Sequence, residues 1–152
     1  MTASRDVLDE YRQVFGPNPE DVVDYSGNRI ALFPDHQARL RVGKRFGPAR
    51  VVLGARRVGT IYLDNSENER KDPAARDVPG YVDKKIDPYT LVDLLATLAP
   101  KGWAKGRSSV TLELSVENLL DRRYVAFGYA FGPPEFLPGA TRSFFFGATY
   151  GF

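Results

Sequence analysis

The sequence predicts an all-β protein, an antiparallel up-and-down meander of about five strands that forms a partial transmembrane β-barrel. Three observations predict this fold class. Several runs alternate apolar and polar residues with period two, which is typical of strands with one face in an apolar medium. The runs are about ten residues long, as a tilted membrane-crossing strand requires. The connections between them are alternately short and long, like the turns and loops of such a barrel.

The composition is compatible with this fold and argues against several others. The 152 residues correspond to one domain at most, and no apolar run approaches the roughly 20 residues of a transmembrane helix. A net charge of +2 gives no electrostatic reason to expect nucleic acid as a partner. Because the chain has no cysteine, it has no disulfide, thiol nucleophile or cysteine metal site.

Residues 1–35 are predicted to be an N-terminal segment and a loop that precede the barrel portion, residues 36–152. Five apolar residues near the start recur at helical spacing: Val7, Leu8, Tyr11, Val14 and Phe15. This stripe is compatible with a short helix, and equally with the tail of an upstream strand or loop. The first ten residues lack the basic and apolar parts of a secretory signal, so we expect no export of the chain as written.

The first two strands are predicted at residues 36–46 and 50–62, joined by a tight turn at Gly47 and Pro48. The first places Ala38, Leu40 and Val42 on one face and arginines on the other. In the second strand, Arg57 falls on the apolar face. We expect it to lie near a membrane interface, where a charge costs little, or the register to shift locally.

A polar loop at residues 63–88 separates this hairpin from the third strand, residues 89–98. A short connection leads to the fourth strand, 108–119, in which Val110, Leu112, Leu114 and Val116 alternate with polar residues. A second long loop, 121–139, precedes the terminal strand. There the alternating residues are Phe144, Phe146, Ala148, Tyr150 and Phe152.

Two stretches carry a family resemblance. Val116-Glu117-Asn118-Leu119-Leu120-Asp121-Arg122-Arg123-Tyr124, then Pro138-Gly139-Ala140-Thr141-Arg142-Ser143-Phe144 and a last strand ending in Phe152, resemble the C-terminus of TonB-dependent outer-membrane receptors. The segment from Asp24 to His36 resembles the same family, in the part that leads from an external loop into a strand. With Phe152 at the periplasmic end, counting strands back places both short turns in the periplasm and all long loops outside.

The resemblance implies a function that this chain shares with a larger protein. Receptors of the family take up ferric siderophores or similar large scarce solutes across the outer membrane of Gram-negative bacteria, and they contain a plug domain inside a closed barrel. This chain would be a C-terminal fragment that is not competent for transport alone. Its expected partners are outer-membrane lipid, the plug and missing strands, the outer-membrane assembly machinery, the TonB complex through the missing N-terminal part, and a ferric siderophore.

The resemblance also assigns roles to residues. Phe144, Phe146, Tyr150 and Phe152 are expected to form the assembly signal, although an amphipathic strand of a soluble β-protein would show the same alternation. In the loop before them, cations and aromatic rings are candidates for ligand contact. These are Arg122, Arg123, Phe127, Tyr129 and Phe131. An interfacial aromatic girdle and loop packing are the alternative, favoured for Tyr124 and open for Phe127 to Phe131.

The other charged residues suggest no enzyme. The predicted inner face carries Arg39, Arg41, Arg45, Arg56, Glu113 and Glu117, which either contact a plug or are solvated in a wet interior. The acidic loop from Asp64 to Asp77 lacks regular calcium-loop spacing, so a solvated face is favoured over a calcium site. His36, the only histidine, is expected to be structural. We therefore expect no catalytic residues, metal or cofactor. A soluble antiparallel β binding module is the competing hypothesis.

Overall fold

The computed structural model describes residues 12–14, 16–18, 22–103 and 108–152. The chain forms two compact units. The sheet unit comprises Ala38–Arg57, Tyr89–Arg123 and Ala140–Phe152, and the loop unit comprises Met1–Gln37, Val58–Pro88 and Tyr124–Gly139. In the described part of the chain, no helix has the length and apolar character needed to cross a membrane.

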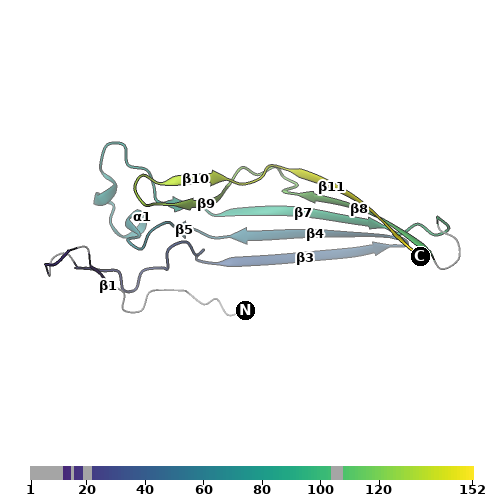
Figure 1. Ribbon diagram of the computed structural model, residues 1–152, viewed down its shortest axis with the longest axis horizontal. Coiled ribbons are helices and arrows are strands. Elements are labelled where there is room, and N and C mark those ends of the chain that lie inside the picture. Colours follow the sequence, from purple (N-terminus) through teal and green to yellow (C-terminus); the bar gives the residue numbers. More distant parts are fainter. Residues whose placement is uncertain (1–11, 15, 19–21, 104–107) are drawn as a thin grey trace. The chain divides into compact units, whose positions relative to one another are not determined.

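The sheet unit is a five-stranded sheet whose neighbours follow one another in sequence order. Its strands lie in the order β11-β8-β7-β4-β3, and successive arrows point in opposite directions (Figure 1). The strands are β3 (Gln37–Phe46), β4 (Ala49–Val58), β7 (Tyr89–Leu98), β8 (Ser109–Glu117) and β11 (Ser143–Gly151). This confirms the predicted all-β fold, an antiparallel up-and-down meander of five strands that is not closed on itself.

The strand register assembles one continuous apolar face. In β8 and β11, Val116 pairs with Phe144, Leu114 with Phe146, Leu112 with Ala148 and Val110 with Tyr150. On the other side of β8, Leu94, Ala96 and Leu98 of β7 pair with the same β8 residues. Since residues paired across strands point to the same face, the predicted apolar sets coincide. On this face Phe146 is 81% exposed and Phe152, just after β11, is 103% exposed, whereas Val116 of β8 is 3% exposed.

The two ends of the sheet differ in their connections. At one end, β3 turns into β4 through Gly47, whose φ of +56° suits glycine, and the Ala99 amide donates to the Pro48 carbonyl at 2.9 Å. The end of β7, the start of β8 and the C-terminus lie at the same end (Figure 1). At the other end, β4 and β8 lead into the two long excursions through the loop unit. The predicted alternation of short and long connections therefore matches the sheet.

The described residues of the loop unit form three two-stranded antiparallel sheets and two short helical turns. The strand pairs are β1 (Arg12–Val14) with β2 (Val22–Asp24), β5 (Ile61–Tyr62) with β6 (Lys85–Ile86), and β9 (Val125–Tyr129) with β10 (Glu135–Pro138). The helical turns are α1 (Asn68–Lys71) and a 3₁₀ turn at Ala74–Arg76. The core of the loop unit includes Tyr62, Leu63 and Ile86, which are 2–7% exposed.

Three sequence predictions need correction. The second strand, predicted to reach residue 62, ends at Val58 because the chain continues by pairing with residues 32–36 instead. A Cβ on Gly59 would lie 1.7 Å from Asp35 Oδ1, so this close approach requires glycine. The predicted loop 121–139 contains the β9–β10 hairpin. Of the N-terminal stripe, residues 1–11 and 15 lie outside the described part, and Arg12–Val14 are a strand rather than a helix.

Candidate ligand-contact surface

The β9–β10 hairpin presents a row of three aromatic rings. Phe127 and Tyr129 occupy alternate positions of β9, so their side chains lie on the same face of the strand, and Phe131 follows two residues after the strand ends. The ring centroids are 6.3 Å apart between Phe127 and Tyr129, and 6.1 Å apart between Tyr129 and Phe131. Phe127 is 49% and Phe131 96% exposed. We call these three residues the aromatic row. It joins three of the ligand-contact candidates that were predicted from the sequence.

The opposite face of this hairpin is packed. A Cβ on Gly128 would lie 3.0 Å from the Glu135 carbonyl oxygen and about as close to the rings and methyl groups of Phe136 and Leu63. Gly128 is accordingly buried, and only glycine allows these neighbours to approach so closely. Phe136 therefore packs within the loop unit, whereas the aromatic row faces outward.

One polar contact fixes the central ring of the row. The Tyr129 hydroxyl donates a hydrogen bond to Glu135 Oε2 across the hairpin. This hydrogen bond, together with burial and the negative charge of Glu135, raises the pKa of Tyr129 above its ordinary value. Tyr129 thus keeps its proton at neutral pH and presents its ring, rather than an ionised oxygen, to the surface.

The other two candidates, Arg122 and Arg123, belong to the sheet unit, where the chain leaves β8. The buried Asn118 holds this turn: its side-chain nitrogen donates to the carbonyls of Arg122 (2.9 Å) and Ala140 (3.0 Å). Its side-chain oxygen accepts from the Arg122 amide at 2.9 Å. Asp121 Oδ1 accepts from the Arg142 amide, also at 2.9 Å. We call this set the Asn118 clasp. It fixes the backbone and leaves the Arg122 and Arg123 side chains exposed.

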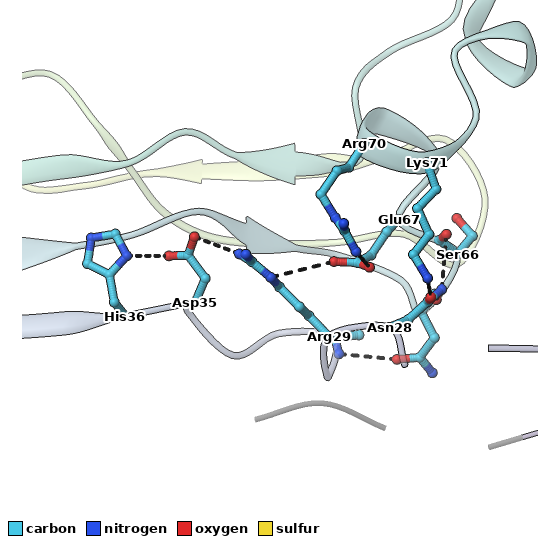
Figure 2. A network of polar contacts seen from close by, with 10 residues as sticks. Asn28, Arg29, Asp35, His36, Ser66, Glu67, Arg70 and Lys71 are labelled. Carbon is cyan, nitrogen blue, oxygen red and sulfur yellow. Dashed lines mark hydrogen bonds and ion pairs between the residues drawn. The ribbon is translucent and has the colours of Figure 1, made fainter. Parts of the chain in front are cut away.

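A polar network holds the first long excursion of the loop unit (Figure 2). The side chain of Glu67 is fully buried, and its Oε2 accepts from Arg70 at 2.6 Å while its Oε1 lies 3.9 Å from Arg29 Nε. Arg29 also donates to Asp35 Oδ2 at 2.6 Å. Asp35 Oδ1 in turn lies 2.8 Å from His36 Nδ1. Four charged groups and a histidine from two distant segments therefore form one connected chain.

Asn28 links the same two segments through hydrogen bonds. It is 4% exposed, donates to the backbone carbonyls of Asn65 and Ser66, and accepts from the Lys71 ammonium group (Figure 2). The acidic loop from Asp64 to Asp77 was predicted to be a solvated face. This prediction is wrong for Glu67, whose side chain is buried. No cluster of acidic, histidine or cysteine side chains in the described residues has the geometry of a metal site.

Asp64 and Tyr62 have shifted pKa values in this network. Burial acts to raise the pKa of Asp64, but hydrogen bonds from Ser66 and Lys84 and the charge of Lys84 outweigh it and hold the pKa below its ordinary value. For Tyr62, burial and then the negative charge of Glu67 raise the pKa. Both shifts keep the groups in their neutral-pH forms, with Asp64 ionised and Tyr62 protonated.

The polar face of the sheet has a recess of about 220 Å³. Of the six inner-face residues predicted from the sequence, Arg39, Arg41, Arg56 and Glu117 line it, together with Asp93 and Gly54. Gly54 has no side chain, and this leaves room in the recess. A Cβ at this position would lie 3.8 Å from the Arg41 side chain. Arg56 Nε is buried without a hydrogen-bond partner. The alternation that predicted the inner face therefore placed these charges correctly on one side of the sheet.

The predicted assembly-signal residues lie on the apolar face of β11 and at its end. Phe144, Phe146 and Tyr150 are 59–81% exposed, and the rings of Tyr150 and Phe152 stack at 6.4 Å. Sequence reasoning missed Asn28, Glu67 and Asn118, the three most buried polar residues described. Two of them, Glu67 and Asn118, adopt positive φ values near +50°, which propensity rules do not anticipate for glutamate.

Two solved structures of receptor proteins have a fold similar to that of this chain. The chain is similar to the crystal structure of the siderophore receptor PiuA from Acinetobacter baumannii, with a TM-score of 0.61 and 22% identity over 89% of this chain. It is also similar to BauA, the ferric preacinetobactin receptor from the same organism, with a TM-score of 0.54 and 18% identity over 83%. The chain spans 16% of the length of each. No protein-family model matches the chain, and neither does any curated protein.

Proposed function

We propose that this chain is the C-terminal part of a TonB-dependent outer-membrane receptor for ferric siderophores or similar large solutes. The observation that carries the proposal is the continuous apolar face of five ordered strands, exposed on a sheet whose fold is that of siderophore receptors. Burying each large apolar side chain of this face in hydrocarbon contributes about 1.5–3 kcal/mol. Such a face fits the lipid side of a barrel wall.

In this proposal the chain has three tasks. Its sheet forms part of the barrel wall, its long excursions form external loops, and Phe144, Phe146, Tyr150 and Phe152 form the signal for the outer-membrane assembly machinery. Transport needs more than these parts, because β3 and β11 are open edges and the meander encloses no channel. The plug domain, the other strands and the connection to the TonB complex belong to the rest of the receptor.

The aromatic row is the surface that we assign to the ligand. Flat, exposed rings at fixed spacing offer stacking area with little loss of conformational freedom, which suits a ligand with aromatic or conjugated groups. Arg122 and Arg123 of the sheet unit are separate candidates: the Asn118 clasp fixes the backbone of Arg122, and the positive charge of both suits an anionic chelate. One structural neighbour is named as the receptor for ferric preacinetobactin, which supports a siderophore as the ligand class.

The first test is solubility. We expect the 152-residue chain to be insoluble when expressed alone in water, because its apolar face and two open edges promote aggregation. In detergent micelles or phosphatidylcholine vesicles it should acquire the β-sheet signal of circular dichroism. A monodisperse, soluble monomer without detergent would contradict the membrane assignment and favour the soluble binding module.

The second test concerns the aromatic row. With the chain folded in detergent micelles, we expect ferric preacinetobactin to bind, and Phe127→Ala and Phe131→Ala each to weaken binding on the order of tenfold, because each removes a stacking ring. Isothermal titration calorimetry provides the measurement. Phe33→Ala is the matched control, since Phe33 is also an exposed phenylalanine of the loop unit (58%) but lies outside the row. Equal losses in all three variants would exclude the row as the ligand surface.

A further inference from the structure

The recess in the polar face of the sheet has an uneven distribution of charge. Its cations, Arg39, Arg41 and Arg56, belong to the adjacent strands β3 and β4. Its carboxylates, Asp93 and Glu117, belong to the next two strands of the sheet, β7 and β8. All of these residues are in the sheet unit. The recess is therefore positive on one side and negative on the other.

Gly54 of β4 separates the two sides. A Cβ on Gly54 would lie 3.8 Å from the Arg41 side chain and 3.9 Å from the Asp93 backbone carbonyl, so this glycine stands between them. The register of β7 and β8 places Glu117 beside Asp93. Arg41 and Asp93 thus lie at one level of the sheet, on strands two spacings apart, which is roughly 10 Å.

No described residue neutralises these charges. None of the five charged side chains forms an ion pair within the described part of the chain. Asp93 Oδ1 accepts from the Asn118 amide at 3.0 Å, which leaves the other carboxylate oxygen for a second donor. Arg56 Nε is buried without a hydrogen-bond partner. Because an unsatisfied buried donor costs free energy, the recess favours an occupant that brings an acceptor to this guanidinium.

The recess continues into a more apolar part. A second recess of about 210 Å³ shares Gly54 and Asp93 with the first and extends along the strands to Val52 and Leu95. Val52 is two residues from Gly54, and Leu95 is two residues from Asp93, so both side chains lie on the same face as the charges. Each part is smaller than the roughly 300–1,000 Å³ of a pocket for a drug-sized molecule. A suitable ligand is therefore small, with a charged end and an apolar end.

We infer that this recess binds a free α-amino acid with an apolar side chain. The carboxylate of the ligand accepts hydrogen bonds from the guanidinium groups, and its ammonium group donates to Asp93 and Glu117. The side chain of the ligand lies against Val52 and Leu95.

The dimensions and charges of an amino acid suit this arrangement. Its nitrogen and carboxylate oxygens are roughly 3 Å apart. A charge-assisted hydrogen bond of about 2.8 Å at each end extends the span to nearly the distance between β3 and β7. A molecule with only one charge is attracted by one side of the recess and repelled by the other. The inference goes beyond the proposed function and does not depend on which face of the sheet contacts lipid.

The test is a titration of the isotope-labelled 152-residue chain in detergent micelles, followed by nuclear magnetic resonance at the Gly54 amide and the Arg56 Nε–H group. The probes are L-leucine, isocaproate and isoamylamine. Isocaproate is leucine without its amino group, and isoamylamine is leucine without its carboxylate. We expect leucine to shift both signals to saturation and to bind at least about tenfold more tightly than either fragment, because only leucine uses both sides of the recess.

Gly54→Val tests the recess without removing a charge. The nearest atom to a Cβ at this position is at an ordinary contact distance, so valine fits the strand but fills the recess. We expect a loss of leucine binding of at least about tenfold. Gly147→Val is the matched control: Gly147 pairs with Glu113 on the same face, its Cβ would lie 3.7 Å from the Glu113 Cβ, and it does not line the recess. Both variants should keep the β-sheet signal of circular dichroism, because valine favours strands.

Two charge variants distinguish the ends of the ligand. Arg41→Gln should weaken leucine binding about tenfold without weakening isoamylamine binding, and Glu117→Gln should weaken leucine binding without weakening isocaproate binding. The inference is overturned if leucine binds no more tightly than the fragments, if Gly54→Val leaves binding unchanged, or if Gly147→Val loses as much. If the chain is soluble without detergent, which contradicts the membrane assignment, the same titration in buffer decides whether the recess binds an amino acid.

Discussion

Replacing Leu114 by arginine is expected to reduce the membrane-inserted form of this chain by a factor of roughly 30 to 1000. Leu114 lies in the middle of β8 and pairs with Phe146 on one side and Ala96 on the other, so it is central on the apolar face. An arginine on the lipid face near the bilayer midplane costs about 2–4 kcal/mol, which corresponds to that factor.

The adjacent residue provides the control. Ser115 pairs with Phe145 and Leu95, so it lies on the opposite, polar face of the same strand. Ser115→Arg introduces the same side chain one position away, and we expect a change of less than about 0.5 kcal/mol. The measurement is the fraction of vesicle-bound chain protected from protease across a urea series. Similar losses for both variants would mean that neither face is specifically in lipid.

Removing the side chain of Asn118 should have the second large effect. Asn118→Ala leaves the carbonyls of Arg122 and Ala140 and the amide of Arg122 without their partners in a site where Asn118 is only 4% exposed. Alanine is also less favourable than asparagine at a φ of +50°. Together these effects should cost about 3 kcal/mol, since each unsatisfied buried group costs about 1–3 kcal/mol and the turn can partly reach water.

A series at this position separates the two causes. Asn118→Gly restores a favourable backbone but lacks the hydrogen bonds, and Asn118→Asp keeps the acceptor for the Arg122 amide while losing both donated bonds. We expect the alanine variant to be the least stable of the three. Hydrogen exchange of the Arg122 amide in micelles reports the clasp directly. If the glycine variant protects this amide as well as asparagine does, the side-chain bonds contribute nothing.

The strands of the sheet were predictable because their faces are set by local alternation. The third strand was predicted at residues 89–98 and is observed at Tyr89–Leu98, since four apolar residues at every second position, 92 to 98, define one face. The end of β4 was not predictable in the same way. Gly59 and Thr60 continue the alternating pattern, but the chain breaks there to pair with residues 32–36, which requires knowledge of a distant segment.

The polar anchors were missed for the same physical reason. Glu67 reads as one more charge in a polar loop, and its burial depends on Arg29, which is far away in sequence. Asn118 lies in a stretch noted only for its resemblance, and no local pattern indicates that it bonds to both Arg122 and Ala140. The aromatic row was found because aromatic residues stand out in composition, although the hairpin that aligns them was predicted to be a loop.

The free edge of β3 makes fragment complementation possible. Half of the backbone amides and carbonyls of this ten-residue strand point away from β4, and β11 offers the same groups at the other edge of the sheet. A separately synthesised polypeptide that supplies the neighbouring strands could therefore dock on both edges and close the ring without a covalent link. When one chain contains both halves, the peptide bond between them raises the effective concentration of each half around the other. The folded arrangement itself does not depend on that bond.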